Sequence, residues 1–186
     1  LQKLGANVNL IIGPISEKVD ENMTVNRVVS SKEMYDLSLK KFKNQDIVIF
    51  SAAVSDFTPQ KNYKKKIKKA DVLNISFKKT NDILKKLGTI KTKQVLIGFA
   101  LETNQELKNA KQKLKDKNLD AIILNSLNDK GAGFGFDTNK ITIIDKDLNQ
   151  KKYPLMTKKE ASKIIVKKAT NIFFSRLNIN KEIKKC

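Results

Sequence analysis

Apolar residues along this 186-residue chain form short continuous runs that alternate with segments of helical spacing. Three runs are typical of buried parallel strands: DIVIF at 46–50, QVLIGFA at 94–100 and DAIIL at 120–124. Residues 8–12, VNLII, predict another strand after a turn at Gly5. Strands that alternate with helices indicate βαβ units, so we expect an α/β fold with a mostly parallel sheet.

Two helices are predicted to begin at capping boxes, in which a hydroxyl side chain and a glutamate three residues later bond to each other's backbone N–H. One box pairs Ser30 with Glu33. The other pairs Thr157 with Glu160 and begins a closing helix that ends at about Leu177. The residues expected to face the core are Met34, Leu37 and Phe42 in the first helix and Ile164, Ile165, Ala169, Ile172 and Phe173 in the last.

The remaining pattern predicts two shorter helices, a further strand and a hairpin. NDILKKLG predicts a short helix that is N-capped by Asn81 and ends at Gly88. Residues 104–118 form a helix with an apolar face of Leu107, Ala110 and Leu114, and the alternation at 72–77 predicts a strand. ITIID and KKYPL, at 141–145 and 151–155, flank a polar turn and indicate a β-hairpin.

Composition fits one globular domain. Hydrophobic residues make up 40% of the chain and charged residues 31%, which are ordinary values for folded proteins. We see no apolar run as long as a membrane span and no signal peptide, and we expect a cytoplasmic protein with no membrane partner. Histidine is absent and Cys186 is the only cysteine, which excludes histidine-based triads and cysteine–histidine metal clusters.

The net charge of +19 is of the kind found in nucleic-acid-binding proteins, but its distribution is different. Arg27 and Arg176 are the only arginines, whereas base readout and bidentate phosphate contacts favour arginine. Lysines are spread from Lys3 to Lys185. We therefore expect no specific nucleic-acid partner, and a general preference for anionic substrates.

Ligands of open parallel sheets bind beyond the carboxyl ends of the strands, so the segments that follow the predicted strands are the candidate site. The small residues of SAAVSD, at 51–56, would let a ligand approach the backbone, although an ordinary turn is an equal alternative. Gly98 indicates a close approach, and Phe99 is either a core residue or a base-stacking residue. Lys113 and Lys117 share a helix face and could bind a polyphosphate, although a solvated face is the commoner explanation.

Standard nucleotide-binding fingerprints are missing from the sequence. There is no GxGxxG motif, and the glycine-rich stretch GAGFGFD at 131–137 lacks the GK[ST] of a P-loop. A nucleotide would have to bind by another route. Six lysines between Lys61 and Lys69 add a basic segment after the SAAVSD stretch.

Seven segments together resemble one family, phosphopantothenate–cysteine ligase, also called phosphopantothenoylcysteine synthetase. In many bacteria this is the C-terminal domain of a bifunctional coenzyme A biosynthesis protein. The segments follow the family's order and spacing to about residue 175. They are GANVNLIIGP at 5–14, SAAVSDF at 51–57, KKIKK at 65–69, KTNDIL at 79–84, IGFALET at 97–103, KQKLKDKNLD at 111–120 and GFGFDTNKITII at 133–144.

The resemblance implies a Rossmann-like, three-layer fold with helices on both faces of the sheet. It also implies a two-step reaction: CTP with Mg²⁺ converts the carboxylate of 4′-phosphopantothenate to an acyl-cytidylate, and the amine of cysteine then displaces CMP. A homodimer is expected from the family, as is a fused or associated phosphopantothenoylcysteine decarboxylase, with FMN only if that upstream half exists. The sequence leaves ATP open as an alternative to CTP.

Residue roles follow from the resemblance where positions match. Lys66 corresponds to the family's catalytic lysine, which contacts the phosphates. The resemblance assigns no metal ligand. The nucleotide-binding positions are Phe50, Ser51, Ala52, Ala53, Asp56, Lys66, Asn81, Asp82, Ile83, Leu84, Phe99, Lys113 and Lys117.

The chain departs from the family at its start. Family members begin with a strand and a loop of the type SNRSSGKMG, which carries an asparagine that handles the acyl-cytidylate, and this sequence begins just after that loop. We therefore expect an N-terminally truncated ligase domain over 1–177 and a basic tail over 178–186. The alternative is a catalytically incomplete nucleotide-binding subunit or fragment.

Overall fold

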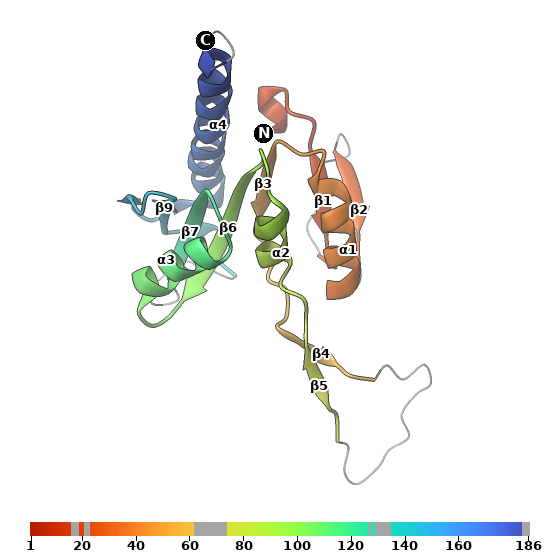
Figure 1. The fold of residues 1–186 in the computed structure, drawn as a ribbon. Coiled ribbons are helices and arrows are strands. Elements are labelled where there is room, and N and C mark those ends of the chain that lie inside the picture. Colours follow the sequence, from red (N-terminus) through yellow and green to blue (C-terminus); the bar gives the residue numbers. More distant parts are fainter. Residues whose placement is uncertain (16–18, 21–22, 62–73, 127, 129–134, 184–186) are drawn as a thin grey trace. The chain divides into compact units, whose positions relative to one another are not determined.

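The computed structural model describes residues 1–15, 19–20, 23–61, 74–126, 128 and 135–183 (Figure 1). Within the span predicted to be one domain, the chain forms two compact units. The larger unit comprises Leu1, Lys41–Ser51 and Leu84–Cys186, and the smaller one comprises Gln2–Lys40 and Ala52–Ile83.

The larger unit contains a five-stranded sheet with the strand order β10-β9-β7-β6-β3. Three neighbouring strands, β3, β6 and β7, are parallel, and β9 and β10 form an antiparallel hairpin beside β7. This confirms the predicted α/β class and the C-terminal hairpin. The strands are β3 (Ile47–Phe50), β6 (Val95–Glu102), β7 (Ala121–Ser126), β9 (Ile141–Asp145) and β10 (Gln150–Lys152).

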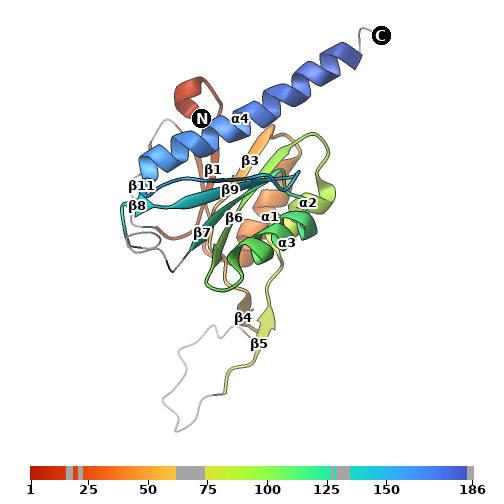
Figure 2. The ribbon, with the colours of Figure 1, turned by 90° about the vertical axis from the view of Figure 1, so that its left-hand side faces the viewer.

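Helices cover both faces of this sheet, as the three-layer prediction requires (Figure 2). The helix α4 (Lys158–Ile183) lies along one face, and α3 (Glu106–Asp116) packs against β6 and β7 on the other. The short helix α2 (Ile83–Ile90) precedes β6. On the α4 face, alternate strand residues and three helix residues form a buried cluster of Val95, Ile97, Ala121, Ile123, Ile141, Ile143, Ala161, Ile165 and Ala169.

The buried strands differ in how far they match the sequence prediction. All residues of β6 from Val95 to Gly98 and the first four of β7 are buried, as expected for strands covered on both faces. By contrast, β3 is an end strand of the sheet and its four residues are only half-buried. The prediction of a fully buried strand at 46–50 is therefore wrong, because continuous apolar sequence does not distinguish an end strand from a central one.

The closing helix confirms its predicted start and inward face. Thr157 Oγ1 donates to Glu160 Oε2 at 2.7 Å, and the Glu160 N–H donates to Thr157 Oγ1 at 3.2 Å. Ile164, Ile172 and Phe173 pack against the buried cluster as predicted. The helix continues past the predicted end at Leu177 to Ile183.

Gly88 lies inside α2 and does not end it, which corrects the predicted helix boundary. A Cβ atom at Gly88 would lie 1.9 Å from the Lys117 carbonyl oxygen. The glycine is therefore required by the close approach of the backbone at the end of α3, and a sequence pattern reads such a glycine as a helix end.

The smaller unit contains two strand pairs and most of a helix. The strands β1 (Asn9–Ile12) and β2 (Thr24–Arg27) pair in parallel, and Asn26 Nδ2 donates to the Leu10 carbonyl at 3.3 Å. A short 3₁₀ helix, η1 (Gln2–Leu4), precedes β1. The helix α1 (Ser31–Phe42) begins at the predicted capping box, in which the Glu33 N–H donates to Ser30 Oγ at 3.2 Å.

A hairpin of β4 (Phe57–Pro59) and β5 (Phe77–Lys79) completes this unit. The strand predicted at 72–77 is displaced: residues 74–76 have no regular structure, β5 begins at Phe77, and 72–73 lie outside the described residues. A two-residue pair, β8 (Thr138–Asn139) with β11 (Met156–Thr157), lies in the larger unit. In the part of the chain that the structure describes, none of the helices has the length and the apolar composition of a membrane span.

Candidate functional site

The carboxyl end of β3 lies directly beside β6. Phe50, the last residue of β3, is in register with Gly98. Ser51 follows Phe50 and is exposed, and Phe99 is the next residue of β6. The structure therefore brings three predicted nucleotide-binding residues together at neighbouring strands, where an α/β sheet commonly binds its ligand.

Phe99 is half-buried and packs against the hydrophobic cluster under α4. Of the two predicted alternatives for this side chain, the structure supports a core contact. The residue as a whole is not fully buried.

Gly98 makes room for the protein's own leucines. A Cβ atom there would lie 2.6 Å from Leu84 Cδ2 and 2.9 Å from Leu119 Cδ1. The close approach predicted at Gly98 is confirmed, and its cause is core packing. Leu84 itself is only 6% exposed, so its side chain belongs to the core.

In the smaller unit, the segment containing Asp56 is bonded to the segment that precedes Asn81. Thr80 N–H donates to the Asp56 carbonyl at 2.9 Å, and Thr80 Oγ1 donates to the Ser55 carbonyl at 2.6 Å. Five of the predicted residues in this unit are exposed, namely Ala52, Ala53, Asp56, Asn81 and Asp82. The sixth, Ile83, is buried. The two predicted nucleotide-binding segments thus lie together within this unit.

The predicted capping role of Asn81 needs correction. The helix α2 begins at Ile83, so Asp82 is the residue that immediately precedes its first turn. Asn81 lies one position earlier, where its side chain is exposed.

Glu102, the last residue of β6, forms an ion pair with Lys113 of α3. The lysine Nζ lies 2.6 Å from Glu102 Oε1, and 45% of the lysine side chain is exposed, against 12% of the glutamate side chain. Glu102 Oε2 also accepts a hydrogen bond from Asn109 Nδ2 at 3.2 Å. Lys117 follows α3 as its C-terminal cap, and its N–H donates to the Lys113 carbonyl at 3.1 Å.

A second polar cluster at the ends of β6 and β7 was not predicted from the sequence. Ser126 Oγ donates to Glu106 Oε1, and Asn128 Nδ2 donates to the same oxygen at 3.0 Å. Asn128 Nδ2 also donates a hydrogen bond to the Thr103 carbonyl at 3.0 Å. Applying the strand-end rule to Ser126, just beyond the apolar run DAIIL, would have found this cluster.

The predicted site residues therefore belong to both units. Phe50, Ser51, Leu84, Phe99, Lys113 and Lys117 are in the larger unit, and Ala52, Ala53, Asp56, Asn81, Asp82 and Ile83 are in the smaller one. Lys66 lies outside the described residues, as does most of the GAGFGFD stretch.

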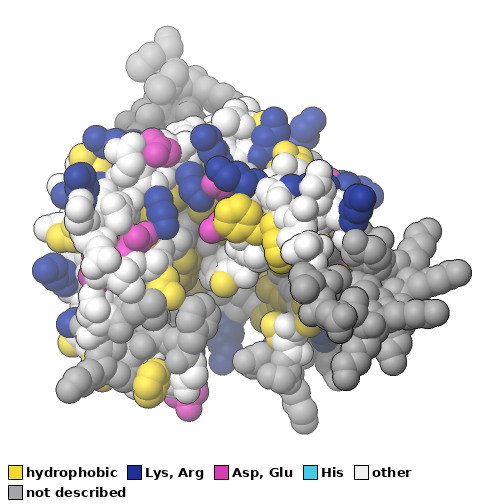
Figure 3. Space-filling model, turned by 90° about the horizontal axis from the view of Figure 1, so that it is seen from below, with side chains coloured by type: hydrophobic (Ala, Val, Ile, Leu, Met, Phe, Trp, Pro, Cys, Tyr) yellow, Lys and Arg dark blue, Asp and Glu magenta, His cyan; other side chains and the backbone are white. Residues whose placement is uncertain are grey.

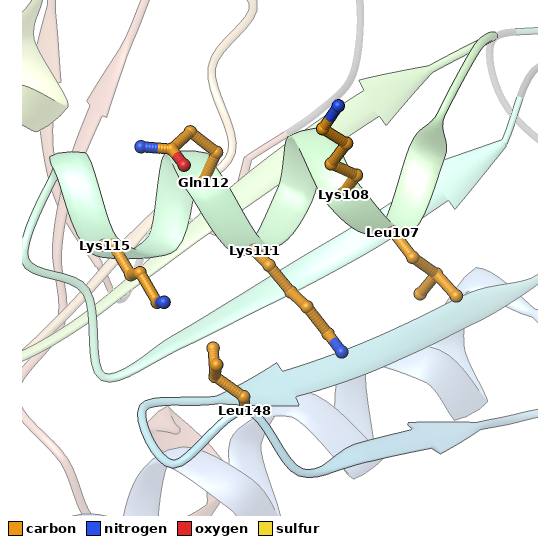
Figure 4. A pocket seen from close by; sticks show the side chains of 6 residues that line it. All are labelled: Leu107, Lys108, Lys111, Gln112, Lys115 and Leu148. Carbon is orange, nitrogen blue, oxygen red and sulfur yellow. The ribbon is translucent and has the colours of Figure 1, made fainter.

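An open groove on the larger unit lies elsewhere. It has a volume of about 380 Å³ and is formed by α3 and the turn between β9 and β10. Figure 4 shows Lys111 and Lys115 extending from α3 on the side where Leu148 lies. None of the predicted nucleotide-binding residues lines this groove: its lining is Leu107, Lys108, Lys111, Gln112, Lys115 and Leu148.

Positive charge is widely distributed. On the face shown in Figure 3, lysine and arginine side chains lie at many separate places, with acidic side chains among them. Among the described residues there is no group of three or more cysteine, aspartate or glutamate side chains that could hold a metal ion.

Comparison with known proteins places the chain in a family. It matches the family described as DNA/pantothenate metabolism flavoprotein C-terminal domain over residues 1–172. It is 43% identical over 162 residues to the coenzyme A biosynthesis bifunctional protein CoaBC of Bacillus subtilis, covering 86% of this chain and 40% of that protein. It is 48% identical over 168 residues to a cysteine/cysteine sulfinic acid decarboxylase of an unknown prokaryotic organism, covering 89% and 47%.

A solved structure agrees with these sequence matches. The C-terminal domain of a coenzyme A biosynthesis bifunctional protein CoaBC superposes with a TM-score of 0.78 at 36% identity, over 94% of this chain and 80% of that one. The chain spans less than half the length of the two curated relatives. The fold and the sequence matches confirm the resemblance drawn from the seven motifs, and the chain belongs to the DNA/pantothenate metabolism flavoprotein C-terminal domain family.

Proposed function

We propose that this chain is a phosphopantothenate–cysteine ligase domain that uses CTP in coenzyme A biosynthesis. The observation that carries the proposal is the pairing of Phe50 with Gly98, which brings the end of β3, with Ser51 after it, beside Phe99 at the carboxyl ends of parallel strands. Motifs of the ligase family fall on this strand edge, in a chain related to CoaBC. Strand edges of this kind bind nucleotides in α/β proteins.

The chemistry joins two molecules through an activated acid. A carboxylate oxygen of 4′-phosphopantothenate attacks the α-phosphorus of CTP, the bond to the β-phosphate oxygen breaks, and pyrophosphate leaves. The amine of cysteine then attacks the acyl carbon, a C–N bond forms, CMP leaves and the amine loses a proton. Neither step needs a histidine or a cysteine nucleophile of the protein, which agrees with a chain that has no histidine.

The side chains of this chain would act mainly by binding and charge compensation. Lys113, Lys117 and Lys66 would contact the phosphates and stabilise the negative charge that shifts to pyrophosphate as it leaves. Phe99, which is half-buried, would contact the base, and Asp56 would accept hydrogen bonds from the nucleotide. The small side chains of Ala52 and Ala53 would leave their backbone N–H groups open to the ligand.

Magnesium would reach such a site with the triphosphate. The described residues provide no acidic cluster for it. In nucleotide sites Mg²⁺ commonly keeps several waters and is bound through phosphate oxygens and one or two carboxylates. Its contribution would be to neutralise phosphate charge in the activation step.

The proposed partner is a second copy of the chain. In the β4–β5 hairpin, Pro59 lies opposite Phe77, and Phe57 lies two residues along the same strand, so these side chains share one face. Phe57 is 55% exposed and Phe77 59% exposed. A lone two-stranded hairpin is marginally stable in water, so an apolar face on it favours a partner surface. A fused or associated decarboxylase, with its FMN, is the second proposed partner.

The proposal is tested by product analysis on the protein in its natural full length. With CTP, Mg²⁺, phosphopantothenate and cysteine, mass spectrometry should find phosphopantothenoylcysteine and CMP in equal amounts. Replacing CTP with ATP tests the choice of nucleotide, and AMP as the preferred product would correct it. Tight CTP binding without any product would instead favour a nucleotide-binding subunit that lacks ligase activity.

A further inference from the structure

Glu102 ends β6 with both of its carboxylate oxygens bonded to α3. Oε1 lies 2.6 Å from Lys113 Nζ, and Oε2 accepts from Asn109 Nδ2 at 3.2 Å. The two donors are four residues apart and so lie on one face of the helix. With 12% of its side chain exposed, Glu102 is held in one orientation between the strand end and the helix.

The loop between β6 and α3 is itself fixed around this carboxylate. Asn109 Nδ2 also donates to the Asn104 carbonyl at 2.9 Å, and the Asn109 N–H donates to the Gln105 carbonyl at 2.9 Å. Gln105 has a φ of 46°, a left-handed conformation that is uncommon for a residue other than glycine. The chain therefore adopts a strained backbone at the point where Glu102 meets α3.

We infer that Glu102 is a positioning residue that holds the Lys113 ammonium at the strand end for the triphosphate of the nucleotide, an inference that rests on the proposed function. An ammonium has three donors, and one bond to Glu102 leaves two for phosphate oxygens. With 45% of its side chain exposed, Lys113 remains open to a ligand. The pair thus orders a flexible lysine before the nucleotide arrives.

Other lysines of the same helix show what the pair adds. Among the described residues, no ion pair involves Lys111 or Lys115, whereas Lys113 pairs with Glu102. A lysine free to sample many rotamers loses that freedom when it binds a ligand, which weakens binding. The ion pair with Glu102 already removes part of the rotamer freedom of Lys113 before a ligand binds.

Glu102 could also weaken nucleotide binding by repulsion, so the direction of the change in binding when its charge is removed tests the inference. A carboxylate near a polyphosphate repels it, so removing the charge would strengthen nucleotide binding if repulsion were the main effect. If positioning is the main effect, removing the charge weakens binding. Glu102→Gln keeps the size of the side chain but turns an amide donor toward either Lys113 or Asn109, so one of the two bonds is lost.

The test is steady-state kinetics of the full-length protein with Glu102→Gln, Lys113→Met and the double variant. We expect Glu102→Gln to raise the KM for CTP about threefold to tenfold, as the loss of one charged hydrogen bond implies, with the KM for cysteine unchanged. In the Lys113→Met background, Glu102→Gln should have no further effect on the KM for CTP, because it acts through Lys113.

Glu106→Gln is the matched control, because Glu106 is an acid at the same strand edge that bonds Ser126 and Asn128. Its effect should add to that of Lys113→Met. A lower or unchanged KM for CTP in Glu102→Gln, additive effects in the double variant, or an equal loss in every kinetic parameter with a lower melting temperature would each overturn the inference. A wild-type protein that neither binds CTP nor releases pyrophosphate would overturn the proposed function and the inference with it.

Discussion

The carboxylate of Asp120 lies 3.2 Å from the ammonium of Lys91, and both side chains are almost completely buried. The same carboxylate oxygen pairs with Arg176 of α4, and the other oxygen accepts the Leu96 N–H at 2.7 Å. Arg176 also donates to the Gln94 carbonyl at 3.0 Å. One carboxylate thus joins β6, α4 and the start of β7, at the end of the sheet opposite to the candidate site.

Replacing Asp120 by asparagine should strongly destabilise the protein. Burial lowers the pKa of Lys91 more than the nearby Asp120 raises it, so the lysine charge is already costly in this place. Without the carboxylate the buried charge is uncompensated, and we expect a loss of about 3–5 kcal/mol in the free energy of unfolding, measured in urea. Asp36→Asn is the control, because its pair with Lys32 is exposed and should contribute little. A loss below about 1 kcal/mol in Asp120→Asn would contradict a central role for this carboxylate.

Asp145, at the β9–β10 turn, should make the free energy of unfolding depend on pH in the acid range. Burial alone would raise the pKa of Asp145, but the hydrogen bond and charge of Lys168 and the N–H groups of Asn149 and Asp147 together hold it below the ordinary value of 3.8. A carboxyl group with a lowered folded-state pKa stabilises the fold above its unfolded pKa, and this contribution disappears as pH falls through the folded pKa.

The corresponding variant is Asp145→Asn. Its deficit in free energy of unfolding relative to wild type should be largest near neutral pH and shrink as the pH falls below 3.8. Lys168→Met, which removes the partner at 3.1 Å, should show the same convergence. A deficit that stays constant from neutral to acid pH would show that charge on Asp145 is not its source.

Local features of this fold were predictable and long-range ones were not. The boxes at Ser30 and Thr157 depend on residues three positions apart, so the sequence contains everything they need. The role of Gly88 depends on the Lys117 carbonyl, which a pattern around residue 88 cannot indicate. For the same reason the half-burial of β3 was missed, since it depends on which strands lie beside it.

The candidate site divides in the same way. The rule for parallel strand ends predicted that the segments after the two apolar runs belong to the candidate site, whereas the register of Phe50 with Gly98 is known only from the structure. The pair between Glu102 and Lys113 was not predictable either, because the sequence relates Lys113 only to its neighbour Lys117 on the helix. Polar partners that meet across a loop become visible only when the backbone is known.

Gly88→Ala should reverse the usual effect of this substitution in a helix. Alanine is normally favoured over glycine by about 1 kcal/mol in helix interiors. Here a Cβ atom would lie 1.9 Å from a backbone oxygen, so the end of α3 must move, and we expect a loss of about 2 kcal/mol or more in the free energy of unfolding. Gly13→Ala is the control, because nothing lies within 4 Å of a Cβ atom there. A more stable Gly88→Ala variant would show that the two segments are not packed as described.

Lys66→Gln tests the role that the family resemblance gives to this lysine. Loss of a charged contact to the reacting phosphates should lower kcat at least about a hundredfold, with the circular dichroism spectrum unchanged. Lys61→Gln serves as the matched control, because it removes a lysine of the same basic segment that matches no family motif. Near-normal turnover in Lys66→Gln would remove this residue from the proposed mechanism.

Pyrophosphate release is the measurement that tests the ligase proposal most directly. Full-length protein is mixed with CTP and Mg²⁺, and phosphopantothenate and cysteine are then added in turn. We predict no pyrophosphate from CTP alone, a release close to one equivalent per site when phosphopantothenate is added, and continuous turnover only when cysteine follows. Failure to release pyrophosphate with either CTP or ATP in the presence of both substrates would contradict the account.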